Sequence, residues 1–151
     1  MKRILFVDDE ANVLQGLQRM LRPMRREWDM TFCPGGQEAL AVLADESFDV
    51  IVSDMRMPGM DGMEVLRRAK KAYPGVQIIM LTGHGSEKDE KEARRLGVFE
   101  YLQKPVEFEK LMRVVTNAYK KKFESSMSAV TFAEAGEFDT ARKILEDEKK
   151  K

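Results

Sequence analysis

The stretch FDVIVSDMRMPGMDG (residues 48–62) indicates how this chain folds. Residues 48–53 are mostly apolar and β-branched, which is typical of a strand buried on both faces. Asp54 comes directly after this run, and the proline and glycines that follow it are typical of a loop. We therefore expect a buried strand that ends in an aspartate where the chain leaves the sheet.

Apolar runs alternate with amphipathic helical patterns on both sides of this stretch. Short β-branched runs favour strands, and apolar residues spaced three or four apart favour helices. The expected strands are 4–7, 30–33, 48–53, 76–81 and 99–102, and the expected helices are 12–20, 37–44, 63–73, 87–96 and 106–123. Five strands alternating with five helices predict an α/β fold, with helices on both faces of a parallel sheet.

Composition limits the classes of function. The chain has 151 residues and an apolar share of 43%, enough for one domain and a short appendage. Twenty-six basic residues balance 26 acidic ones, so the overall charge gives no reason to expect direct binding to nucleic acid or to a membrane.

The compartment follows from the cysteine and from the apolar runs. Cys33 is the only cysteine, so we expect neither an intramolecular disulfide nor a cysteine metal cluster. The first apolar run stops at Asp8, too early for a signal peptide, and no stretch approaches the roughly 20 apolar residues of a membrane span. We expect a soluble protein in the reducing cytoplasm.

Polar residues follow the expected strands at the points where they end. Asp8 and Asp9 follow the first strand, Asp54 the third, Thr82 the fourth and Lys104 the fifth. The carboxyl ends of parallel strands meet at one edge of the sheet, which is where ligands of such sheets bind. We therefore expect these side chains to form one site.

Three carboxylates in one place repel one another unless a cation lies among them. Oxygen ligands at an open edge favour Mg²⁺, which keeps part of its water. A carboxylate beside Mg²⁺ and a lysine has what a phosphoryl acceptor needs, because the cations neutralise the phosphoryl oxygens while the carboxylate attacks phosphorus. The Thr82 hydroxyl is placed to donate a hydrogen bond to the same oxygens.

Each residue also has a simpler interpretation. The Asp8–Asp9 pair is typical of a helix N-cap with a solvated neighbour, Asp54 of a turn, and Lys104 of a solvated surface. A P-loop NTPase would need G-x-x-x-x-G-K-[ST], which is absent from the sequence. A hydrolase of small phosphate esters would need a second acid–base residue near Asp54, and the sequence offers none. The joint occurrence at successive strand ends favours the phosphoryl acceptor.

Four motifs resemble those of a known family, the receiver domain of two-component response regulators. They are VDDE (7–10), SDMRMPGMDG (53–62), LTG (81–83) and YLQKP (101–105). The resemblance covers about residues 2–122 and implies a flavodoxin-like (CheY-like) doubly wound sheet with strand order 2-1-3-4-5. We expect a receiver domain at 1–122 and a helical extension at 123–151.

The resemblance also implies the roles of the acidic residues. Asp54 would accept a phosphoryl group from a sensor histidine kinase or a phosphotransfer protein. Asp9, Asp54 and the backbone carbonyl of Arg56 would bind Mg²⁺ directly, and Asp8 would bind it through water. Lys104 would pair with the phosphoryl oxygens.

A switch is implied as well. The Thr82 hydroxyl would move to the phosphoryl group while the Tyr101 ring turns inward, and the change would be read by a downstream protein on the surface of the fourth helix, fifth strand and fifth helix. The peptide bond between Lys104 and Pro105 would be cis, which costs little for an X-Pro bond.

The chemistry implied by the resemblance is only partly enzymatic, because such domains catalyse their own phosphorylation and dephosphorylation but turn over no other substrate. Arg56 and His84 lie at the two positions that tune hydrolysis in the family, and we expect them to crowd the path of the attacking water. His84 is the only histidine, so we do not expect the chain to be its own phosphohistidine donor.

Residues 123–151 are too few for an ordinary output domain. Residues 127–135 and 138–145 have helical patterns separated by Gly136, and AGEFDTA (135–141) faintly resembles a tetratricopeptide-type helical hairpin. We expect this segment to pack on the receiver or on a second copy in a homodimer, and a solvated extension of the last helix is the alternative.

The sequence therefore predicts a stand-alone receiver whose output is protein contact gated by phosphorylation of Asp54. Two alternatives stay open. One is a phosphorelay intermediate that passes its phosphoryl group to a histidine phosphotransfer protein. The other is a receiver-shaped scaffold that is not phosphorylated.

Overall fold

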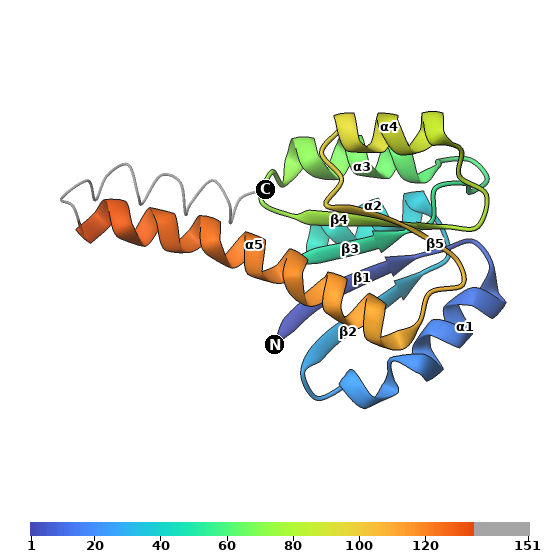
Figure 1. Ribbon diagram of the computed structural model, residues 1–151, viewed down its shortest axis with the longest axis horizontal. Coiled ribbons are helices and arrows are strands. Elements are labelled where there is room, and N and C mark those ends of the chain that lie inside the picture. Colours follow the sequence, from blue (N-terminus) through green and yellow to red (C-terminus); the bar gives the residue numbers. More distant parts are fainter. Residues whose placement is uncertain (135–151) are drawn as a thin grey trace.

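The computed structural model describes residues 1–134 as alternating strands and helices (Figure 1). The strands are β1 (Lys2–Val7), β2 (Trp28–Cys33), β3 (Val50–Ser53), β4 (Gln77–Thr82) and β5 (Glu100–Gln103). The helices are α1 (Ala11–Met20), a 3₁₀ turn η1 (Arg22–Met24), α2 (Gly36–Asp45), α3 (Gly62–Ala72), α4 (Glu87–Arg95) and α5 (Phe108–Glu134).

The five strands of this region form one parallel sheet in the order β2-β1-β3-β4-β5. Figure 1 shows α1 and α5 on one face of the sheet and α2, α3 and α4 on the other. The predicted fold class, including its strand order, is confirmed.

Side chains that alternate along each strand divide the core into two clusters. In β1, Leu5 and Val7 pack with α2, α3 and α4, whereas Ile4 and Phe6 pack with α1 and α5. Both faces of the strand are thus buried, which is why it reads as a continuous apolar run rather than an alternating one.

Several boundaries differ from the prediction, most of them by one or two residues, and two of these differences have a clear physical cause. β2 begins at Trp28 instead of residue 30, because Trp28 pairs with Lys2 and its ring is buried. α5 continues to Glu134, well past its expected end near 123, because no proline or glycine lies between residues 108 and 134. The expected helical pattern at 127–135 is largely the continuation of this single helix.

The rest of the predicted extension, including the helix expected at 138–145, lies outside the described residues. The predicted domain boundary between residues 122 and 123 falls inside α5. Within residues 1–134, none of the helices combines the length and the apolar character that a bilayer crossing requires.

Candidate functional site

The polar strand-end residues meet at the carboxyl edge of the sheet. Asp8 and Asp9 directly follow β1, and Asp54 directly follows β3, its neighbour. Thr82 is the last residue of β4, and Lys104 directly follows β5. Because β1, β3, β4 and β5 are consecutive in the sheet, residues separated by up to 96 positions come together as predicted.

The three aspartates form a compact acidic cluster. One carboxylate oxygen from each of Asp8, Asp9 and Asp54 lies within 4.8 Å of the other two. Asp8 and Asp54 are 2% and 6% exposed, whereas Asp9 is exposed at the mouth. Carboxylate oxygens alone, open to water on one side, suit a hard divalent ion such as Mg²⁺.

Lys104 is the cation of this cluster. Its Nζ donates to Oδ2 of Asp8 at 2.6 Å and to Oδ2 of Asp54 at 3.2 Å. Burial alone would lower the pKa of Lys104, but the two carboxylates outweigh burial and raise it. The Lys104–Pro105 peptide bond is cis, as the sequence resemblance implies.

One lysine does not fully compensate the acidic cluster. Burial raises the pKa of Asp8 above its usual value, although Lys104 and the backbone N–H of Glu10 act in the opposite direction. Three carboxylates face one ammonium group in this cluster. The site thus holds an excess of negative charge that a further cation would relieve.

The backbone around Asp54 is fixed by hydrogen bonds and by a glycine. The N–H of Asp54 donates to the carbonyl of Val7 at 2.8 Å, and Asp54 Oδ1 accepts from the N–H of Met55 at 2.7 Å. A Cβ on Gly62 would lie 2.1 Å from the carbonyl oxygen of Asp54, so only glycine allows α3 to start this close to the site. The sequence motif contained Gly62, but the contact that requires it is visible only in the structure.

Thr82 and Tyr101 lie beside the cluster. The buried Thr82 hydroxyl accepts a hydrogen bond from the N–H of His84 at 3.3 Å. Tyr101 is 7% exposed, and its hydroxyl donates to Sδ of Met55 at 3.9 Å. The aromatic ring therefore already points inward in this structure, whereas the sequence resemblance associates the inward ring with the phosphorylated state.

Gly85 is a further site residue, which the sequence analysis did not single out. A Cβ at this position would lie 1.6 Å from the Tyr101 hydroxyl oxygen and 2.8 Å from Cγ2 of Thr82. Gly85 therefore provides the space into which the Tyr101 ring points. No local pattern indicates this, because Gly85 and Tyr101 belong to different elements.

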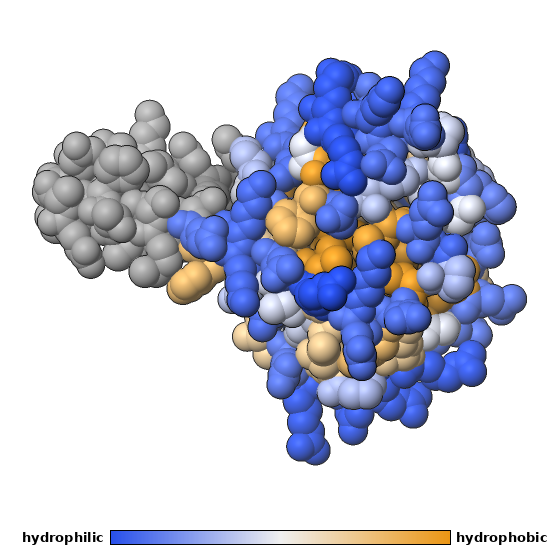
Figure 2. All heavy atoms as spheres, viewed as in Figure 1, coloured by the Kyte–Doolittle hydropathy of each residue, from blue (hydrophilic) through white to orange (hydrophobic). Residues whose placement is uncertain are grey.

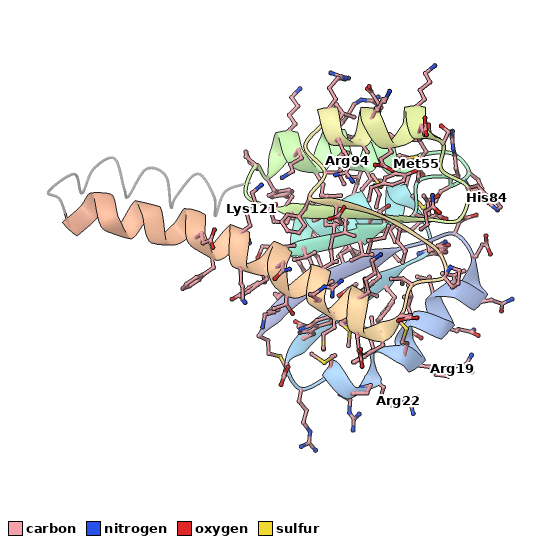
Figure 3. All side chains as sticks on the ribbon, in the orientation of Figure 1. Arg19, Arg22, Met55, His84, Arg94 and Lys121 are labelled. Atoms are coloured by element: carbon pink, nitrogen blue, oxygen red, sulfur yellow. The ribbon has the colours of Figure 1, made fainter. Side chains whose placement is uncertain are left out.

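Arg56 and His84 are exposed at the mouth of the site. Figure 3 shows His84 on the loops at the carboxyl edge, while Met55 lies in the interior beneath α4. The Arg56 guanidinium binds Oδ2 of Asp89 on α4 at 2.5 Å. This partner was not predicted.

Residues 4–116 match the family described as the response regulator receiver domain. The transcriptional regulatory protein GlrR of Escherichia coli is 37% identical over 115 residues, which are 76% of this chain and 26% of that protein. The transcriptional regulatory protein ZraR of Salmonella typhimurium is 30% identical over 149 residues, 95% of this chain and 33% of that protein. This chain thus spans about a quarter to a third of the length of these relatives.

Solved structures are similar to this chain in fold and belong to the same family. The crystal structure of a response regulator receiver domain protein from Clostridium thermocellum is 35% identical, with a TM-score of 0.75, and the match covers 81% of this chain and 97% of that one. Receiver domains generally bind Mg²⁺ at an acidic pocket, and this chain has a cluster of three aspartates, Asp8, Asp9 and Asp54. The chain belongs to the response regulator receiver family of two-component signalling proteins.

Proposed function

We propose that Asp54 accepts a phosphoryl group from a phosphohistidine of a sensor kinase or a phosphotransfer protein, in a reaction that requires Mg²⁺. The observation that carries the proposal is the cluster of three carboxylates within 4.8 Å, two of them bridged by Lys104, at the ligand-binding edge of the sheet. Membership of the receiver family supports it, because phosphorylation is a general feature of that family.

Asp9, Asp54 and the backbone carbonyl of Arg56 would hold the metal ion directly, with Asp8 acting through water. When bound, Mg²⁺ screens the negative charge of the phosphoryl oxygens from the attacking carboxylate. The donor set fits this ion, because it is composed only of oxygens and keeps Asp9 open to solvent.

The residues of the chain carry out the transfer. A carboxylate oxygen of Asp54 forms a bond to phosphorus as the P–N bond of the donor breaks, and the donor imidazole leaves with that electron pair and takes up a proton. Lys104, which already lies 3.2 Å from Asp54, pairs with the phosphoryl oxygens, and the Thr82 hydroxyl donates to them. Hydrolysis by water would return Asp54 to its carboxylate, so the protein turns over only its own acyl phosphate.

Output would pass through protein contact on the face of α4, β5 and α5. Figure 2 shows apolar surface gathered between α4 and α5. Val98, Phe99 and Val106, which flank β5, are only partly buried. We propose that Thr82 and Tyr101 couple phosphorylation to this face and that the target is a separate protein, so that the chain acts as a stand-alone receiver. The free, buried Cys33 fits the reducing cytoplasm.

Arg56 and His84 would tune the lifetime of the phosphoryl group, because both side chains are exposed at the mouth through which water must approach. We expect the double variant Arg56→Ala, His84→Ala to lose its phosphoryl group faster than wild type. Loss at an equal or slower rate in the double variant would contradict this role.

Intact mass after incubation with Mg²⁺ and a small acyl-phosphate donor tests the function. Wild type should gain one alkali-labile phosphoryl group, and Asp54→Ala should gain none. Asp45→Ala, an exposed aspartate at the end of α2, is the matched control and should be labelled like wild type. Labelling of Asp54→Ala, or no labelling of a folded wild type, would refute the proposal.

A further inference from the structure

An ion pair joins the loop of Asp54 to the start of α4. Arg56 lies two residues after Asp54, and its Nη2 donates to Oδ2 of Asp89 at 2.5 Å. The two partners are 33 positions apart in sequence and belong to different elements, so the pair connects the reacting loop with a helix on the predicted output face.

Asp89 also caps α4. The same Oδ2 accepts from the N–H of Ser86 at 3.3 Å, while Ser86 Oγ accepts from the N–H of Asp89 at 3.1 Å. This reciprocal arrangement is a capping box, which fixes the first turn of the helix. A change in the partner of Arg56 therefore acts directly on the capping box at the start of α4.

α4 depends on such contacts more than the other helices of this layer. Only Ala93 is buried among its nine residues, whereas α3 buries five of its eleven residues. A helix with so little buried surface gains little from core packing, so polar contacts at its end carry more weight in fixing its position.

The same groups act electrostatically on Tyr101, the switch residue. Burial raises the pKa of the Tyr101 hydroxyl, the carboxylates of Asp89, Glu90 and Asp54 raise it further, and the Arg56 guanidinium lowers it. The hydroxyl of Tyr101 thus lies in the field of both possible partners of Arg56.

We propose that Arg56 is a positioning residue that binds Asp89 in the unphosphorylated protein and the phosphoryl group after Asp54 is phosphorylated, so that phosphorylation releases the start of α4. The inference rests on the proposed phosphorylation of Asp54. A phosphoryl group brings about two negative charges and three acceptor oxygens, and it attracts a guanidinium group more strongly than one carboxylate does. The pair with Asp89 is easily exchanged, because the Arg56 side chain is 58% exposed to water.

Thermodynamic linkage fixes the direction of the effects. Asp89→Asn keeps an oxygen that can accept from Ser86 but removes the charge that holds Arg56 in the unphosphorylated state. The phosphorylated state loses nothing, so this variant should bind a phosphoryl mimic more tightly, by about two- to fivefold, the range for an exposed ion pair. Arg56→Gln should bind the mimic more weakly, because its uncharged side chain no longer attracts the phosphoryl group, the stronger of the two partners of Arg56.

Calorimetric titration with Mg²⁺ and beryllium trifluoride, a phosphoryl mimic, tests the inference. The matched control is Glu92→Gln, which removes a carboxylate of α4 that pairs with Arg95 and with Arg67 of α3 but not with the Asp54 loop. Glu92→Gln should bind like wild type, and Asp89→Asn should lose its advantage at high salt, where exposed ion pairs are screened. In an Arg56→Gln background, Asp89→Asn should change the affinity no further.

The outcomes separate this inference from the proposed function. If wild type binds the mimic but Asp89→Asn and Glu92→Gln cannot be distinguished, the exchange of partners is refuted and the function stands. An Asp89→Asn effect that persists in the Arg56→Gln background would also refute it, because the effect would then be independent of the pair. A folded wild type that binds no mimic would refute both.

Discussion

The two edges of the sheet both carry ion clusters, but their charges are balanced differently. At the amino edge, Asp49 accepts from the N–H of Arg3 and from Nζ of Lys122, each at 2.8 Å. The Arg3 guanidinium then pairs with Asp29 and Glu46. At the carboxyl edge, two carboxylates share Lys104 and a third, Asp9, stands beside them.

The difference shows which cluster serves stability and which serves chemistry. Every carboxylate at the amino edge is paired with a cation, Asp29 and Glu46 with Arg3 and Asp49 with Lys122. Three carboxylates thus face two cations, and the cluster ties β1, the loop before β3 and α5 together. At the carboxyl edge three carboxylates face one lysine, and this larger excess of negative charge costs folding free energy and is relieved when a cation binds. Functional sites often carry such a cost in stability.

The largest difference between the edges should be the effect of replacing their lysines on the rate of phosphoryl labelling. Lys104→Ala should slow phosphoryl labelling by about a hundredfold or more, because a charged donor to the phosphoryl oxygens is lost. Lys122→Ala removes a comparable ion pair at the amino edge and should leave the labelling rate unchanged. Time courses of intact mass with an acyl-phosphate donor measure both rates. Equal rates in the two variants would show that the position of the lysine does not matter.

Replacing a glycine by alanine should lower stability beside the site and raise it in α1. Gly85→Ala must displace the Tyr101 ring and should lower the free energy of unfolding by about 2 kcal/mol, because part of the burial of Tyr101 is lost. Gly16 of α1 has no atom within 4 Å of an added Cβ, so Gly16→Ala should raise stability by about 0.5 kcal/mol. Denaturant titration measures both. A Gly85→Ala variant as stable as wild type would mean that the ring moves without cost.

Removing one carboxylate should have opposite effects at the two edges. Without Mg²⁺, Asp54→Asn should raise the free energy of unfolding by about 1 kcal/mol, because it relieves repulsion with Asp8 and Asp9. Asp49→Asn should lower it by about 1 kcal/mol, because Lys122 loses its charged acceptor. Urea titrations of both variants beside wild type give the signs. Destabilisation by both would show that the carboxyl edge is not under electrostatic strain.

The smallest expected effect is that of the metal on stability. At a Mg²⁺ concentration equal to its dissociation constant, wild type should gain about 0.4 kcal/mol, which corresponds to a rise in Tm of about 1–2 °C. Asp49→Asn should gain the same amount and Asp54→Asn less. Thermal melts with and without Mg²⁺ at constant ionic strength measure this, and an equal gain in Asp54→Asn would place the ion elsewhere.

Much of the fold and of the site could be predicted because it follows from local patterns. The runs at 4–7 before Asp8 and at 50–52 before Ser53 and Asp54 are apolar without a break, which favours strands buried on both faces. Once the sheet is parallel, the residues after its strands must meet at one edge. That argument placed Thr82 and Lys104 beside the aspartates without any knowledge of their contacts.

The features that the sequence did not reveal depend on contacts between distant elements. Asp89 looks like an ordinary charged residue of the first turn of α4, and only the structure brings Arg56 to it. Gly85 looks like a flexible loop residue until Tyr101 is placed against it. The start of β2 was missed because Trp28 and Asp29 do not form an apolar run, although Trp28 is buried by tertiary packing.

α5 is long enough to act as a lever. Its 27 residues form one uninterrupted helix of about 40 Å, and Figure 1 shows that its far end projects well beyond the sheet. A rigid rod transmits a small change of tilt at one end as a larger displacement at the other. A slight reorientation near Phe108, next to the phosphorylation edge, would therefore be amplified at Glu134, so a target placed there could sense phosphorylation without touching the site.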